Sequence, residues 1–289
     1  MGQALVLAAA VGFGLNPVLA QILLHQGFAP DLIALFRFLI PALVVLPFTP
    51  IRCFYQAEFL RTAGVGMVAG LGMLAYFYCL NLLPVSMVIL SYYSYPLFAL
   101  LIGRLWFGLS VSRNRLIAGV LILLAVSLIL DPVTAGAVPL WAVVLCFVAP
   151  CSFGLLINYF SNPLQPLSTG LRMSASLTGH LVVLVPVSFL ATSIQMVPSS
   201  FEQLFLVLLF GTVTAAIPQY FFAKGSAMTS MEQTTALASF EVVFALLFAS
   251  WFLDSELGRL ELVASGLIVL AGLIRLEPQV NGKLLSEPN

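Results

Sequence analysis

The chain is a succession of ten apolar runs, each about the length of a membrane-crossing helix, separated by short polar or Pro- and Gly-containing breaks. Hydrophobic residues make up 61% of the 289 residues and charged residues 8%, against about 25% charged residues in ordinary soluble domains. This composition excludes a soluble fold. We therefore predict an all-α membrane protein with ten transmembrane helices and almost no chain left for a soluble domain.

The breaks between the apolar runs predict where each span begins and ends. The spans lie near residues 2–24, 31–50, 62–82, 84–106, 114–130, 137–159, 167–190, 202–223, 232–253 and 260–276. The connections are short, and the third and fourth spans meet almost without a loop at Asn81 to Pro84. Such tight connections predict that neighbouring helices run antiparallel.

Lysine and arginine residues near the span ends predict the orientation, because short loops that carry them stay on the cytoplasmic side during insertion. With the N-terminus inside, Arg259 lies outside, and the cytoplasmic side collects Arg52, Arg61, Arg104, Arg113, Arg115, Lys224, Arg275 and Lys283. The far side receives Asp31, Asp131, Asp254 and Glu256. We predict a multi-pass protein of the cell inner (plasma) membrane with both termini in the cytoplasm. The first span lacks a basic n-region and a cleavage motif, so it is expected to stay in the mature protein.

The two halves of the chain share short sequence matches. Phe98-Ala99-Leu100-Leu101 in the fourth span recurs as Phe244-Ala245-Leu246-Leu247 in the ninth, at an offset of 146 residues (244 − 98). The same offset carries Asp131-Pro132 onto Glu277-Pro278 (277 − 131). Gly119 matches Gly266 at an offset of 147 residues (266 − 119), and Arg37 matches Arg172 at an offset of 135 (172 − 37). These matches predict a duplication of five spans.

Because five is odd, the second copy must enter the membrane from the opposite face. The predicted architecture is two inverted-topology repeats of five helices, at residues 1–132 and 137–278, followed by a cytoplasmic tail at 279–289. Halves of opposite orientation can exchange conformations around a site near the midplane, which favours alternating access. Duplication that serves packing alone is the alternative.

Short motifs in several spans carry a family resemblance. They are Gly12-Phe13-Gly14 with Asn16-Pro17, Arg37-Phe38, Tyr93-Ser94-Tyr95-Pro96, Glu241-Val242, and Glu256 with Gly266. On these motifs the chain resembles the drug/metabolite transporter superfamily, specifically its EamA-type members, over nearly its whole length. Phe13 stands where that family usually has Trp, Val242 where it often has Pro, and no acidic residue follows Gly108 to match Glu256. The resemblance implies export or exchange of amino acids or similar metabolites through a central cavity, without nucleotide hydrolysis.

Glu241 is predicted to lie near mid-depth of the bilayer, about 13 Å into the ninth span at 1.5 Å per residue. Gln233 and Thr234 are expected to continue a polar stripe beside it. A charged group inside a bilayer is costly unless it is paired or hydrated, which makes Glu241 a functional candidate. It is expected to bind a substrate ammonium or to carry a proton. The alternatives are a buried ion pair with Arg172 and a protonated carboxyl bonded to a neighbouring span.

Arg37 and Arg172 lie only about six residues inside their spans, so their long side chains are expected to reach opposite membrane interfaces. The alternative is that Arg172 reaches the cavity and binds a substrate carboxylate through two parallel hydrogen bonds.

The fourth span carries a polar and aromatic run at Ser91–Pro96 near its middle. Tyrosine usually lies at membrane interfaces, so deep tyrosines favour a cavity for an apolar or zwitterionic solute, with packing between helices as the alternative. Proline breaks occur at Asn16-Pro17, Pro96, Pro150 and Pro218-Gln219. Such breaks are tolerated where they line a cavity, and ordinary helix kinks are the alternative.

The candidate substrate-binding residues are Glu241, Tyr92, Tyr93, Ser94, Tyr95, Asn16, Gln219 and Arg172. We expect no catalytic group, cofactor or metal site, because His25 and His180 stand apart and the four cysteines lack the spacing of a zinc or redox site. The expected partners are a small-molecule substrate and membrane lipid. The net charge of zero gives no basic surface for nucleic acid, and the oligomeric state is left open, a monomer included.

The sequence therefore predicts a transporter of small metabolites such as amino acids, either an exporter or an exchanger or facilitator that works by alternating access, and not an enzyme. A carrier of phosphorylated or nucleotide-linked sugars is less well supported, because two peripheral arginines are a poor supply of cations. A membrane-embedded enzyme acting on lipid would need a convergent nucleophile, base or metal cluster. A non-transporting scaffold would leave the proline breaks and Glu241 without a purpose.

Overall fold

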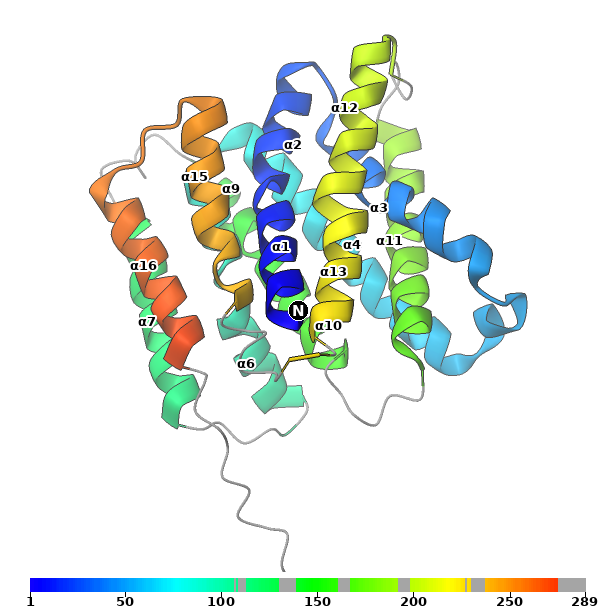
Figure 1. The fold of residues 1–289 in the computed structure, drawn as a ribbon, viewed down its shortest axis with the longest axis horizontal. Helices are drawn as coiled ribbons and strands as arrows, with labels where there is room; N and C mark the ends of the chain where they lie inside the picture. The colour runs from blue at the N-terminus through cyan, green and yellow to red at the C-terminus, as the bar shows by residue number, and fades with distance from the viewer. Residues whose placement is uncertain are drawn as a thin grey trace, which may run out of the picture.

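The computed structural model is a bundle of helices that pack side by side (Figure 1). It describes residues 1–106, 108, 113–129, 139–160, 167–191, 198–226, 228–229 and 237–274, and within these ranges it contains no β-strand. The prediction of an all-α protein is confirmed. Asp131, Arg275, Glu277 and Lys283, on which part of the repeat and orientation argument depended, lie outside the described residues.

Seven helical segments of the described residues are long and apolar enough to cross a membrane. They comprise α1 (Gly2–Gly14) with α2 (Asn16–His25), α3 (Pro30–Val45) with η1 (Leu46–Phe48), α4 (Ala57–Leu82), α5 (Val85–Tyr92) with α6 (Tyr95–Trp106), α9 (Leu140–Cys146) with α10 (Val148–Phe160), α11 (Thr169–Ala191), and α12 (Phe201–Gly211) with η3 (Thr212–Ala216) and α13 (Ile217–Ser226). The shorter helices are α7 (Arg113–Ile129), α15 (Glu241–Leu253) and α16 (Arg259–Ile274), and η2 (Ile51–Tyr55) is a short connecting turn.

The predicted proline breaks coincide with interruptions of the helices. Leu15 separates α1 from α2 ahead of Pro17, and the π-helix η3 precedes Pro218. The α5–α6 and α9–α10 breaks lie just before Pro96 and Pro150. Proline cannot donate a backbone hydrogen bond and clashes with the carbonyl four residues earlier, which explains why the helices divide here.

The ninth predicted span, 232–253, is interrupted within its described part: residues 237–238 are helical and Ser239 and Phe240 form a turn. Helix α15 begins at Glu241, after a turn at Ser239 and Phe240. Gln233 and Thr234, the predicted polar stripe, lie outside the described residues. Glu241 is thus the first residue of a helix and not a mid-helix residue.

Helix packing joins the first half of the chain to the second. Helix α4 packs along α11, α7 along α16 and α1 along α13, while α10 lies against both α4 and α6. Figure 1 shows α7 and α16 side by side at one edge and α1 near the centre. Two apolar clusters fill the bundle, one containing Tyr76 and the other containing Ile89, Tyr93 and Ala245.

Two glycines make equivalent contacts in the two halves. A Cβ on Gly14 of α1 would lie 2.7 Å from the Phe244 Cβ and 3.0 Å from the Ala245 nitrogen of α15. A Cβ on Gly154 of α10 would lie 2.7 Å from the Ala99 nitrogen and 3.0 Å from the Phe98 Cβ of α6. The Phe-Ala pairs that they contact are the same pairs that match at the 146-residue offset (244 − 98).

Small residues allow α4 and α11 to approach closely. A Cβ on Gly66 of α4 would lie 2.9 Å from the Cα of Ser176, so the two backbones are in direct contact there. In a bilayer, helices associate by such close packing because lipid tails are as apolar as the side chains.

We expect Gly66→Ala to destabilise the protein by roughly 1–3 kcal/mol, because the added methyl group would force the two backbones apart. Gly64→Ala is the matched control, since a Cβ at Gly64 of the same helix meets nothing within 4 Å. Thermal unfolding of the purified protein in detergent measures both. Equal unfolding temperatures for the two variants would contradict the close contact.

Candidate functional site

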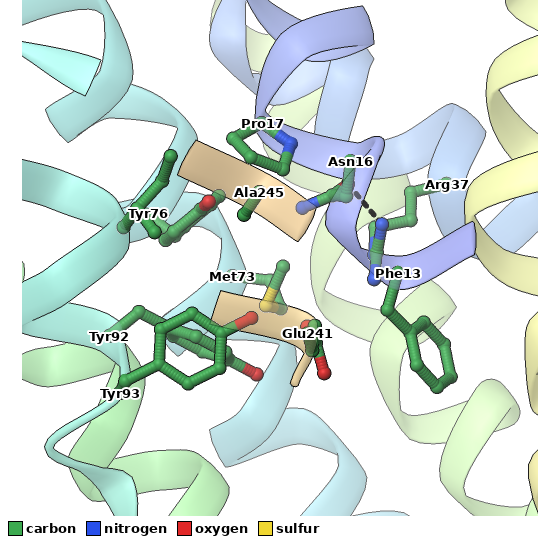
Figure 2. A pocket seen from close by; sticks show the side chains of 11 residues that line it. Phe13, Asn16, Pro17, Arg37, Met73, Tyr76, Tyr92, Tyr93, Glu241 and Ala245 are labelled. Carbon is green, nitrogen blue, oxygen red and sulfur yellow. Dashed lines mark hydrogen bonds between the residues drawn. The ribbon is translucent and has the colours of Figure 1, made fainter. Parts of the chain in front are cut away.

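A cavity lies between the two apolar clusters, and the space inside it that could hold water is about 20 Å³ (Figure 2). It is lined by Phe13, Asn16, Pro17, Arg37, Met73, Tyr76, Ile89, Tyr92, Tyr93, Glu241 and Ala245. A water molecule needs about 10–15 Å³ of such space, so the cavity as it stands holds about one water, and a solute the size of an amino acid requires the surrounding helices to move apart. The lining comes from α1, α2, α3, α4, α5 and α15, and therefore from both halves of the chain.

The helix interruptions place polar residues at the cavity wall. Asn16 is the first residue of α2, Glu241 is the first residue of α15, and Tyr93 directly follows α5. Helix ends leave backbone groups without partners inside the helix, and such ends are tolerated within a membrane protein where they line a cavity. The breaks predicted from proline are therefore breaks at which the chain turns polar groups inward.

Arg37 lies in the cavity wall and not at a membrane interface. Its side chain is buried, and Nη1 donates hydrogen bonds to the side-chain oxygen of Asn16 and, at 3.2 Å, to Oγ1 of Thr214. Figure 2 shows the bond from Arg37 to Asn16. The expectation that Arg37 extends to an interface is wrong, because α2 and the π-helix η3 supply hydrogen-bond acceptors inside the bundle.

The Nε atom of Arg37 is buried without a hydrogen-bond partner. Buried polar atoms are nearly always paired, so an orphaned donor beside a cavity indicates a group whose partner comes from a ligand or water. Thr214, which accepts from the same Nη1 atom as Asn16, itself donates to the Phe210 carbonyl at 2.7 Å. The network fixes Arg37 from one side only.

Glu241 is half-buried and shares the cavity with Arg37. Both residues are described in full, and they form no ion pair within 4.0 Å. The Tyr93 hydroxyl lies within interacting distance of the Glu241 carboxyl, and Figure 2 shows both directed to the same space. The cavity thus holds one cationic and one anionic side chain apart from each other.

Tyrosine rings form the wall beside Glu241. The Tyr92 ring centre lies 5.3 Å from that of Tyr76, 5.8 Å from that of Tyr93 and 5.6 Å from that of Phe153. Aromatic rings at these separations pack favourably. Tyr92 and Tyr93 therefore serve both of the roles that the sequence left open, because they line the cavity and also pack between helices.

The other predicted binding residues do not line this cavity. Arg172 donates from Nε to the Leu167 carbonyl at 2.8 Å, near the start of α11. The Ser94 hydroxyl donates to the Ser91 carbonyl at 2.7 Å. The Tyr95 ring packs on that of Phe153, with their ring centres 4.9 Å apart. Gln219 is half-buried on α13 and is also absent from the cavity wall.

Several cavity residues escaped the sequence analysis. Tyr76 and Met73 of α4 line the cavity. Thr214, which does not line it, accepts a hydrogen bond from Arg37. Tyr76 carried the same signal as Tyr92, a tyrosine deep in an apolar span. Thr214 carried none, because a single threonine in a membrane helix usually bonds its own backbone.

We expect Thr214→Val, which keeps the side-chain shape, to lower the free energy of unfolding by about 1.5–3 kcal/mol, because hydrogen bonds to charged groups contribute that much. Thr212→Val is the matched control on the same π-helix, where no hydrogen bond to Arg37 is present. Chemical or thermal unfolding in detergent measures the difference. If Thr214→Val unfolds like Thr212→Val, the bond to Arg37 contributes nothing.

Comparisons with known proteins agree with this architecture. The model of the EamA-like transporter family matches residues 1–131 and 140–275. Two proteins of Helicobacter pylori, from strains ATCC 700392 / 26695 and J99 / ATCC 700824, are each called an uncharacterized transporter; both are 27% identical over 289 residues, covering 93% of this chain and 94% of theirs. A solved crystal structure has a TM-score of 0.58 and 17% identity over 93% of this chain and 96% of that chain, a likeness that concerns the fold alone.

Proposed function

Because the chain belongs to the EamA-like transporter family, we propose that it carries a small zwitterionic metabolite, such as an amino acid, across the inner (plasma) membrane. The observation that carries this proposal is the separate placement of Arg37 and Glu241 in the wall of one cavity, which widens to admit the solute. A zwitterion presents a carboxylate and an ammonium group to these two side chains at once. The chain exports or exchanges this solute by alternating access.

The carboxylate of the solute binds Arg37. Asn16 and Thr214 occupy Nη1, while Nε has no partner. A guanidinium can present a planar pair of N–H groups that matches the two oxygens of a carboxylate. One bound carboxylate would supply the partner that Nε lacks.

The ammonium group of the solute binds Glu241 and the adjacent tyrosine rings. A cation over a tyrosine ring gains further stabilisation when water is excluded. Each charge of the zwitterion then offsets the desolvation of one side chain, because a buried charge is tolerated when it is paired and hydrogen-bonded. A phosphorylated or nucleotide-linked sugar fits this cavity less well, since Arg37 is the one cation among the lining residues.

Two five-helix repeats of inverted topology account for the packing. In the proposed repeat, α1 corresponds to α10, α4 to α13 and α6 to α15. The packing of α1 against α13 then has its equivalent in the packing of α10 against α4, and the packing of α1 against α15 has its equivalent in the packing of α10 against α6. The equivalent contacts of Gly14 and Gly154 support the same correspondence. We propose repeats at 1–132 and 137–278 and a tail at 279–289, with α7, α15 and α16 completing ten spans. Both termini lie in the cytoplasm, an orientation supported by the exposed Arg52, Arg61, Arg104, Arg113 and Lys224.

Counterflow of radiolabelled solutes in proteoliposomes tests the proposed function. A panel of amino acids and related metabolites, run with and without a pH gradient, should contain at least one zwitterion that exchanges. Exchange of phosphorylated sugars alone, or of none of the panel, would overturn the proposed substrate class. If the initial rates of counterflow are the same with and without a pH gradient, the protein is a facilitator and Glu241 is not a proton carrier.

We expect Glu241→Gln to slow counterflow at least about tenfold, because the loss of a charge-assisted hydrogen bond costs about 1.5–3 kcal/mol. The amide keeps the size of the side chain, so the unfolding temperature should stay near that of the parent protein. Normal counterflow by this variant would rule out an essential charge at position 241.

The two intramembrane arginines provide a matched comparison. Arg37→Gln should abolish measurable counterflow of the zwitterion, because its carboxylate loses its partner in the cavity. Arg172→Gln should retain counterflow, since Arg172 does not line the cavity. Equal loss in both variants would contradict the assignment of Arg37 as the carboxylate-binding residue.

A further inference from the structure

Two cysteines from different halves of the chain meet inside the bundle. Cys79 is 0% exposed on α4, and Cys146 is 3% exposed on α9. The spacing of the cysteines in the sequence predicts no such pair, because 67 positions (146 − 79) separate them. The fold brings them together because α4 and α9 are packed neighbours.

The contacts of Cys79 locate its sulfur on the face of α9 that carries Cys146. The Cys79 thiol donates to the Ala142 carbonyl at 3.8 Å. Residues four apart lie on one face of an α-helix, so Cys146 is the next residue on the face that Ala142 presents. In an α-helix the carbonyl of residue 142 points toward the backbone nitrogen of residue 146, so this contact places the Cys79 sulfur beside Cys146.

The pair lies at a structurally sensitive point. Cys146 is the last residue of α9, and Phe147 interrupts the helix before α10 begins at Val148. Cys79 belongs to the last turn of α4. A covalent bond between the two sulfurs would tie the end of one helix to the break in a span of the other half.

We propose that Cys79 and Cys146 form an oxidisable dithiol that small, uncharged two-electron oxidants convert to an intramolecular disulfide linking the two halves. With an azodicarboxamide as oxidant, one thiolate adds to the N=N bond and forms an S–N adduct. The second thiolate attacks that sulfur, the S–N bond breaks, and an S–S bond forms. Two electrons and two protons leave the thiols and reduce the azo group to a hydrazine.

The disulfide slows transport, a consequence that rests on the proposed function. Helix α10 carries Phe153 next to the cavity. The centre of its ring lies 5.6 Å from the ring centre of Tyr92 and 4.9 Å from that of Tyr95. Alternating access requires the halves to move relative to each other. A bond that joins α4 to the α9–α10 break restrains that movement on the side of the cavity that these rings form.

The experiment treats the full-length protein with diamide in a background in which Cys53 and Cys151 are replaced by alanine. Alkylation after denaturation should find two fewer free thiols than in the untreated protein, and mass spectrometry should find a peptide that links 79 to 146. The unfolding temperature should rise, because a disulfide restricts the unfolded chain. Counterflow should fall several-fold and recover after reduction. The matched control replaces Cys79 and Cys146 by serine and keeps Cys53 and Cys151, a variant in which diamide should cause none of these changes.

Full recovery of both thiols after diamide treatment would overturn the dithiol, as would a linked peptide that does not join 79 to 146. A disulfide that forms and stabilises the protein while counterflow stays at its original rate would refute the restraint on transport. Failure of the proposed function gives a different result: the untreated protein exchanges no solute, while the linked peptide and the stability shift are still present.

Discussion

The burial of Arg37 is the constraint on which the rest of the site depends. A guanidinium inside a bilayer must find hydrogen-bond acceptors within the protein, since lipid offers none. Asn16 is available because the first span divides at Leu15, and Thr214 is available on the π-helix of the eighth span. Two departures from regular helix geometry therefore converge on one side chain. The cavity exists where these departures leave helix ends facing each other.

The sequence predicts the helical architecture well, because local signals determine it. Apolar runs mark the spans, and Pro17, Pro96, Pro150 and Pro218 mark where helices divide. Asn16, Tyr92, Tyr93 and Glu241, all chosen from the sequence, line the cavity. Each carried a signal readable within its own span, either a polar group beside a proline or a polar group deep in apolar surroundings.

The remaining features depend on contacts between distant segments. Arg37 and Arg172 each lie a few residues inside an apolar run, and only the three-dimensional arrangement decides which one meets Asn16 and Thr214. The neighbouring thiols of Cys79 and Cys146 and the contact between Gly66 and Ser176 likewise join residues of different halves. The spacing of residues along the sequence contains no information about such partners.

The register of the two halves also has a consequence for charge. The offset that aligns Phe98-Ala99 with Phe244-Ala245 places Tyr95 opposite Glu241 (241 − 95 = 146), so one copy has a phenol where the other has a carboxylate. Arg37 lines the cavity, whereas Arg172, 135 residues further along the chain (172 − 37), does not. Two carboxylates in one cavity would repel each other unless one of them were protonated. The lining of this cavity carries one carboxylate, Glu241, and so avoids that repulsion.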